Sequence, residues 1–110
     1  MPSQVIRFDA LRSLGFASIS GTYAAVGGAF THQVRLLKFV NLTDANLTVS
    51  FDGTTDNDII PANGFALYDG TTNKVSSEAT FVFQPGTQIL VKGSPTSGSF
   101  YVIALFGRGE

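Results

Sequence analysis

The chain has 110 residues and a net charge of −1, and only 14% of its residues are charged. This length fits one domain, and folding at this size buries roughly 65% of the surface of the unfolded chain. The absence of cysteine and the single histidine exclude disulfide frameworks, zinc–thiolate sites and multi-histidine metal sites, so we expect no cofactor. The low basic charge predicts no nucleic-acid partner. The longest apolar run, Phe100 to Phe106, is far shorter than the ~20 residues that span a bilayer, which predicts no membrane partner.

The first fourteen residues mix charged and apolar side chains without the turn residues found elsewhere in the chain. Such a segment forms either a first strand or short helix of the domain, or an arm that reaches onto a neighbouring subunit. We predict an N-terminal arm over residues 1–14 and a single domain over residues 15–110. In the arm, Ile6, Phe8 and Leu11 are the side chains expected to make subunit contacts.

The rest of the chain is typical of short strands separated by Gly, Asn, Asp and Thr clusters. Leu47, Val49 and Phe51 alternate with polar residues, which is the period-2 pattern of a half-buried strand. Between two further strands, Asn63 and Gly64 supply the positive φ that a tight turn needs. The other predicted strands cover residues 15–19, 34–40, 59–60, 65–68, 80–83 and 88–92.

The last predicted strand differs from the others because Phe100 to Phe106 shows no polar alternation. A strand of this kind has both faces covered. It is either a central strand of a sandwich, or a strand whose second face packs on another subunit. For the second alternative, the expected contact residues are Phe100, Val102 and Phe106.

Together these patterns give about eight short strands and almost no helix signal. They predict an all-β fold, either an antiparallel β-sandwich (jelly-roll-like) or a small barrel.

Three aspartates are the one candidate for a metal site. Asp52, Asp56 and Asp58 lie within seven residues around Gly53, and calcium prefers several oxygen ligands. Their spacing does not match the EF-hand loop, so an ordinary polar loop is the alternative. We predict no enzyme, because the sequence has no G-x-S-x-G nucleophile motif and its acidic residues lie in predicted turns.

Carbohydrate binding is the alternative function. β-Sandwiches often present aromatic and acidic side chains at loop ends, and Tyr23, Tyr68 and Tyr101 are available for this role. However, the chain has no tryptophan, and Tyr68 and Tyr101 lie inside predicted strands. We therefore expect these two tyrosines to pack in a core or an interface.

The sequence resembles small virion structural proteins of tailed bacteriophages. The similarity covers most of the chain from Arg7 onward and is concentrated in turns and strands. It follows the segments at residues 34–37, 41–45, 49–53, 58, 61–65, 67–69, 72–73, 86–92 and 94–101.

This resemblance implies a non-enzymatic β-sandwich that is built into the virion in many copies. As a capsid cement or decoration protein, or a neck or tail joining protein, the chain would contact other virion proteins and form a symmetric homo-oligomer. The contacts would bury apolar surface and exchange strands or arms between copies. No catalytic residue is implied by the resemblance.

Overall fold

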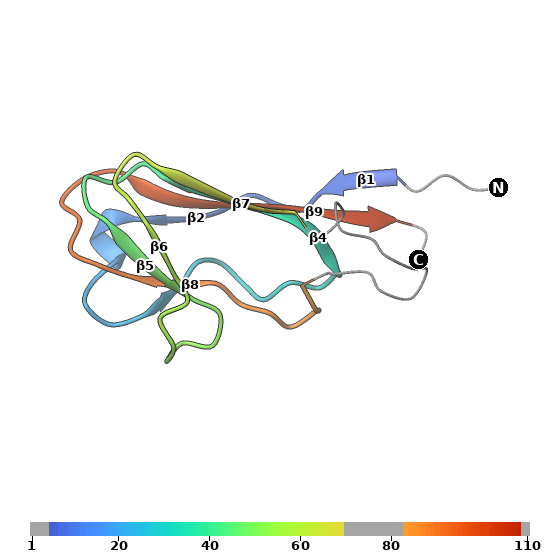
Figure 1. Cartoon of the computed structure of the whole chain (residues 1–110), viewed down its shortest axis with the longest axis horizontal. Coiled ribbons are helices and arrows are strands. Elements are labelled where there is room, and N and C mark those ends of the chain that lie inside the picture. Colours follow the sequence, from blue (N-terminus) through green and yellow to red (C-terminus); the bar gives the residue numbers. More distant parts are fainter. Residues whose placement is uncertain (1–4, 70–82, 109–110) are drawn as a thin grey trace.

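The predicted all-β fold is confirmed in the computed structural model of the chain, which describes residues 5–69 and 83–108 (Figure 1). The described residues form nine strands and one short 3-10 helix, η1 (Phe16–Ser18). All strand pairs are antiparallel. The strands form two separate sheets, so the sandwich is the architecture and the small barrel is not.

The first sheet has the order β1-β9-β4-β7, and β2 also pairs with β9. Its strands are β1 (Val5–Phe8), β2 (Arg12–Gly15), β4 (Val34–Asn41), β7 (Phe65–Asp69) and β9 (Ser99–Arg108). The second sheet has the order β3-β8-β5-β6, formed by β3 (Ala24–Ala25), β5 (Leu47–Ser50), β6 (Asp58–Ile60) and β8 (Leu90–Lys92). Strands early in the chain pair with strands late in the chain: β1 and β2 pair with β9, β3 with β8, β4 with β7, and β5 with β6. This nested pairing is that of a jelly roll.

One predicted strand differs from the structure, and another lies mostly outside the described residues. The strand expected over residues 15–19 is wrong, because β2 ends at Gly15 and η1 follows it. There the Ile19 N–H donates to the Phe16 carbonyl (3.1 Å) and closes the helical turn. The strand expected over residues 80–83 lies outside the described residues except for Phe83, whose N–H and carbonyl both bond to Val34.

Two turns show why the sequence carries Asn and Gly where it does. Asn63 has a φ of 58°, in the left-handed region that Asn tolerates, and turns the chain from β6 into β7. Gly98 precedes β9 with a φ of 89°. A Cβ at Gly98 would lie 2.0 Å from the Leu42 carbonyl oxygen, so a larger residue does not fit this turn.

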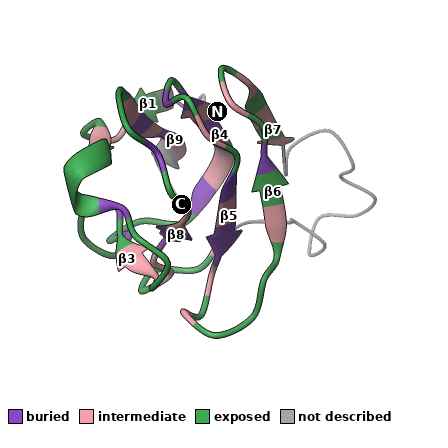
Figure 2. Ribbon diagram, turned by 90° about the vertical axis from the view of Figure 1, so that its left-hand side faces the viewer, coloured by how far each residue is buried: buried purple, intermediate pink, exposed green. Residues whose placement is uncertain are grey.

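The core lies between the two sheets and takes alternate residues from each strand. Phe39 is fully buried, and its ring lies within 6.1 Å of the rings of Phe51, Tyr68 and Phe100. Full burial of one such side chain stabilises the fold by roughly 1.5–3 kcal/mol. Figure 2 shows buried segments of β4, β5 and β9 in purple.

A buried polar network joins the end of β4 to the turns of the second sheet. The Asn41 side-chain amide donates to the carbonyls of Ala45 (2.9 Å) and Ile60 (3.0 Å). Its oxygen accepts from the Thr43 N–H (3.0 Å) and hydroxyl (2.6 Å). Asn41 and Thr43 are almost completely buried, and such groups stay in a core only when they are hydrogen-bonded. This network fixes the distance between the two sheets at one end of the sandwich.

The N-terminal segment belongs to the first sheet over the residues that the structure describes. β1 and β2 both pair with β9 of the same chain, and the predicted boundary at residue 14 falls inside β2. Arg12 anchors this segment: it forms an ion pair with Asp9 (3.1 Å), donates to the Gly28 carbonyl (2.9 Å) and lies 4.6 Å from the ring centre of Phe30. Of the two alternatives for this segment, the described residues adopt the strand.

Candidate functional site

The outward side of β9 is apolar. β9 is a central strand, and Phe100, Val102 and Ala104 point inward and are completely buried. Successive side chains of a strand point to opposite faces, so Tyr101, Ile103 and Leu105 point away from the core. These three are half-buried.

The strands beside β9 continue this apolar surface. Residues that pair directly across antiparallel strands share one face of the sheet. Leu105 pairs with residues of β1 and β4, and Tyr101 and Ile103 pair with β4, which pairs in turn with β7. We define the outer apolar face as the three outward residues of β9 together with Phe8, Leu36, Val40, Phe65 and Leu67.

Several side chains of the outer apolar face are strongly exposed. Phe8 is 73% exposed, Phe65 66% and Leu67 53%. Four strands at ~4.8 Å spacing and five residues at ~3.3 Å rise give a face on the order of 300 Å² in projection. Exposed apolar patches of a few hundred Å² are often interaction sites. The outer apolar face is therefore a candidate interaction site.

Lys38 is the charged residue among the described side chains of this face. It lies between Ile103 and Leu67 in the strand register. Its Nζ stands 5.6 Å from the ring centre of Phe65 on β7, the last strand of the sheet. The side chain thus lies along the sheet toward its edge, so that the apolar stem covers the face while the ammonium group reaches the rim.

The residues that the sequence predicted for an interface are distributed differently. Phe100 and Val102 belong to the core of the chain itself, so their assignment to an interface is corrected. Phe106 is half-buried, with its ring stacked on that of His32 (3.9 Å between centres). Phe8 lies on the outer apolar face.

The two remaining residues of the predicted arm lie around β1. Leu11 is 62% exposed and stands in the connection between β1 and β2. The backbone of Ile6 pairs with Gly107, and the side chain of Ile6 lies outside the described residues.

The interface residues predicted on β9, Phe100 and Val102, belong to its inward side, and the outward residues of β4 and β7 were not predicted. The uninterrupted apolar run did not show which alternate residues point inward. A signal was available in β7, where the large side chains Phe65 and Leu67 stand at alternate positions. Ala66 and Tyr68, between and after them, pack against the core.

The three aspartates have separate partners. Asp52 accepts backbone N–H bonds from Thr55 (2.7 Å) and Thr54 (2.9 Å), which lower the pKa of its carboxyl group. Asp56 accepts from the Tyr23 hydroxyl and lies 3.3 Å from Lys92 Nζ.

Asp58 accepts a hydrogen bond from the Tyr68 hydroxyl. Burial and this bond raise the pKa of Tyr68. Among the described residues, no three His, Cys, Asp or Glu side chains, these aspartates included, form a group that could hold a metal ion.

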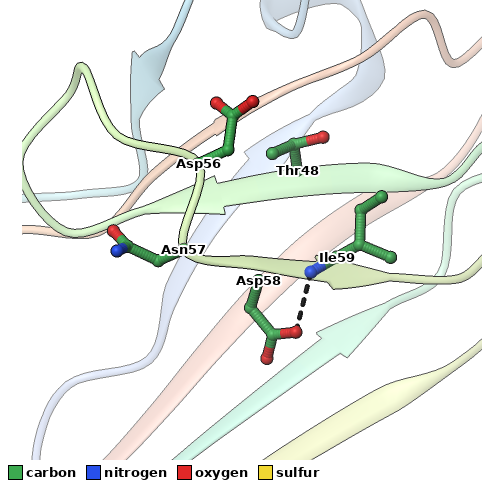
Figure 3. A pocket seen from close by; sticks show the side chains of 5 residues that line it. All are labelled: Thr48, Asp56, Asn57, Asp58 and Ile59. Carbon is green, nitrogen blue, oxygen red and sulfur yellow. Dashed lines mark hydrogen bonds between the residues drawn. The ribbon is translucent and has the colours of Figure 1, made fainter.

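A shallow pocket of about 290 Å³ lies on the second sheet and is open to solvent (Figure 3). Asp58 points to the opposite side of β6 from Ile59. The pocket is lined by Thr48, Asp56, Asn57, Asp58 and Ile59.

None of the tyrosines considered for sugar binding lines this pocket, although the hydroxyls of Tyr23 and Tyr68 donate to the lining residues Asp56 and Asp58. The Nζ of Lys92 covers the ring of Tyr23 at 4.6 Å, Tyr68 packs against the core, and Tyr101 lies on the outer apolar face. The arrangement offers no shared aromatic platform from these three residues.

Comparison of the chain with protein-family models, curated proteins and solved structures gave no match. In the part of the chain that the structure describes, no helix has the length and apolar character needed to cross a membrane.

Proposed function

We propose that the chain is a non-enzymatic structural protein of a bacteriophage virion. It stabilises or joins components of the particle, as a capsid cement or decoration protein or as a head–neck–tail accessory. The observation that carries this proposal is the outer apolar face, which covers one side of the first sheet and has no covering layer among the described residues. A surface of this kind gains free energy when a neighbouring subunit removes it from water.

The resemblance to virion structural proteins supports the same proposal at the level of the fold. Several residues on which the resemblance rests stabilise the fold: Asn41 and Thr43 form the buried network, and Asn63 makes the turn into β7. The proposed partners are other virion proteins and further copies of the chain, arranged symmetrically in the particle. The mechanism is burial of apolar surface, with few charges to be desolvated.

The proposal is tested on purified virions of the phage that encodes the chain. Particles are isolated on a density gradient and dissociated, and the chain is quantified by mass spectrometry against the major capsid protein. We expect a fixed ratio that corresponds to many copies per particle. Recovery of the chain only in the soluble fraction of the infected cells, with none in the particles, would contradict the proposal.

A further inference from the structure

We propose that the outer apolar face is covered by a second copy of this chain, packed face to face about a two-fold axis near Ile103. This inference deepens the proposed function and rests on it in one respect: it takes the outer apolar face as the subunit contact. Two sheets that pack face to face keep their strands within about 30° of each other and interlock their side chains.

The distribution of exposed apolar residues favours a two-fold contact. Among the described residues, the outer apolar face holds three of the large apolar side chains that are more than half exposed: Phe8, Phe65 and Leu67. On the second sheet Ile59 is exposed alone, paired with Thr48, which in turn pairs with Lys92. A chain with one such face can bury it against a copy of itself only through the same face, which is an isologous contact.

The position of Lys38 fits this arrangement. A lysine that projects from the middle of the face would be buried opposite its own copy, and two like charges there would oppose the dimer. Instead, its Nζ lies over the ring of Phe65, toward the edge formed by β7. This position moves the ammonium group away from Ile103 toward the edge strand, so the like charges of the two copies are separated from the axis.

The size of the face sets the strength of the contact. A standard stable interface buries ~800 Å² on each partner, whereas this face measures on the order of 300 Å² in projection. A dimer on this face alone is therefore weak and depends on concentration. In a particle, where each copy makes other contacts as well, the same face adds to the total through its high effective concentration.

The first experiment measures the mass of the full chain by sedimentation velocity from about 5 µM to about 500 µM, a range suited to an interface of this size. We expect a shift from monomer to dimer. Leu67→Asp should raise the dissociation constant by more than about tenfold, because it places a charge in the apolar contact. Ile59→Asp is the matched control, since Ile59 is 59% exposed and Leu67 53%, but on opposite sheets. The control should dimerise like the unchanged chain.

A second experiment uses the absence of cysteine in the chain. Ile103→Cys introduces one thiol next to the proposed axis, and a short bis-maleimide reagent should join two copies. Ile59→Cys, on the second sheet, should not be cross-linked under the same conditions. Far-ultraviolet circular dichroism of each variant checks that the fold is kept.

Three results would overturn the dimer: a monomer over the whole concentration range, a dimer that Leu67→Asp leaves intact, or equal loss in the Ile59→Asp control. These outcomes are independent of the proposed function. A chain found in virions but monomeric in solution removes the dimer and keeps the virion proposal. A chain that dimerises in solution but is missing from virions keeps the dimer and removes the virion proposal.

Discussion

The outward faces of the two sheets differ in their chemistry. The second sheet presents Thr48, Ile59 and Lys92 at paired positions, with the charged loop around Asp56 beside them. The first sheet presents mostly apolar side chains together with Lys38, and the register also places Ser13 and Asp69 on this side, opposite Tyr101 and Leu36. The second face is compatible with water as it stands, whereas the first gains from a partner. Under the proposed function, the second sheet would face solvent and the first would serve assembly.

The largest expected effect is a difference in the free energy of unfolding between variants on the inner and outer sides of β9. Phe100→Ala should destabilise the fold by about 3–5 kcal/mol, because it leaves a cavity in the core against Phe39. Ile103→Ala should cost less, about 1–2 kcal/mol, because its side chain is only partly buried. Urea denaturation at a concentration where the chain is monomeric measures both. Equal losses for the two variants would contradict the assignment of inner and outer faces.

A smaller effect concerns the lysine on each outward face. Lys38→Met should strengthen the dimer several-fold, up to about tenfold, since it removes the charge from the outer apolar face. Lys92→Met is the matched control, because both lysines stand over an aromatic ring, Phe65 and Tyr23 respectively. Sedimentation velocity should show no change in the dimer for the control. A dimer weakened by Lys38→Met would argue that a partner carboxylate binds this lysine.

The smallest effect is a dependence on acid that arises on the second sheet. The backbone N–H of Thr55 lowers the pKa of Asp52, and the Tyr23 hydroxyl lowers the pKa of Asp56. A carboxyl group with a lowered folded pKa stabilises the fold above its ordinary value of ~3.9, and this contribution is lost as the pH falls through the folded value. The free energy of unfolding should therefore decrease slightly below a pH of about 4.

The acid effect should change the dimer less than the fold, because Asp69, which pairs with Leu36 at the end of β7, is the acidic residue that the described register places on this side of the first sheet. Urea denaturation and sedimentation at pH 7 and pH 3 separate the two quantities. Asp52→Asn should flatten the pH profile of stability. A dissociation constant of the dimer that changes with pH, together with a free energy of unfolding that stays constant, would contradict this prediction.

The sequence predicted the sandwich because its strands carry local signals. Leu47 and Val49 alternate with polar residues in β5, and Asn63 with Gly64 marks the turn into β7. The N-terminal strands were not predicted as such, since residues 5–15 have no clear period and their structure depends on pairing with β9.

The candidate site was predicted only in part. The uninterrupted apolar run in β9 indicated that both faces need cover, and the structure places the strand centrally between β4 and the N-terminal strands. Which side faces outward depends on the register with β4, which pairs the buried residue Phe39 with Val102 and places Lys38 opposite Ile103. A shift of one residue exchanges the two faces of a strand, and no local pattern in Phe100 to Phe106 records it.

The central claim is that the chain acts through the outer apolar face. Its most direct test is the copy number of two variants in virions assembled without the unchanged chain, measured by mass spectrometry. The account predicts that Ile59→Asp enters the particle at the normal copy number and that Leu67→Asp is largely lost from it, although both fold. Equal incorporation of the two variants would contradict the claim.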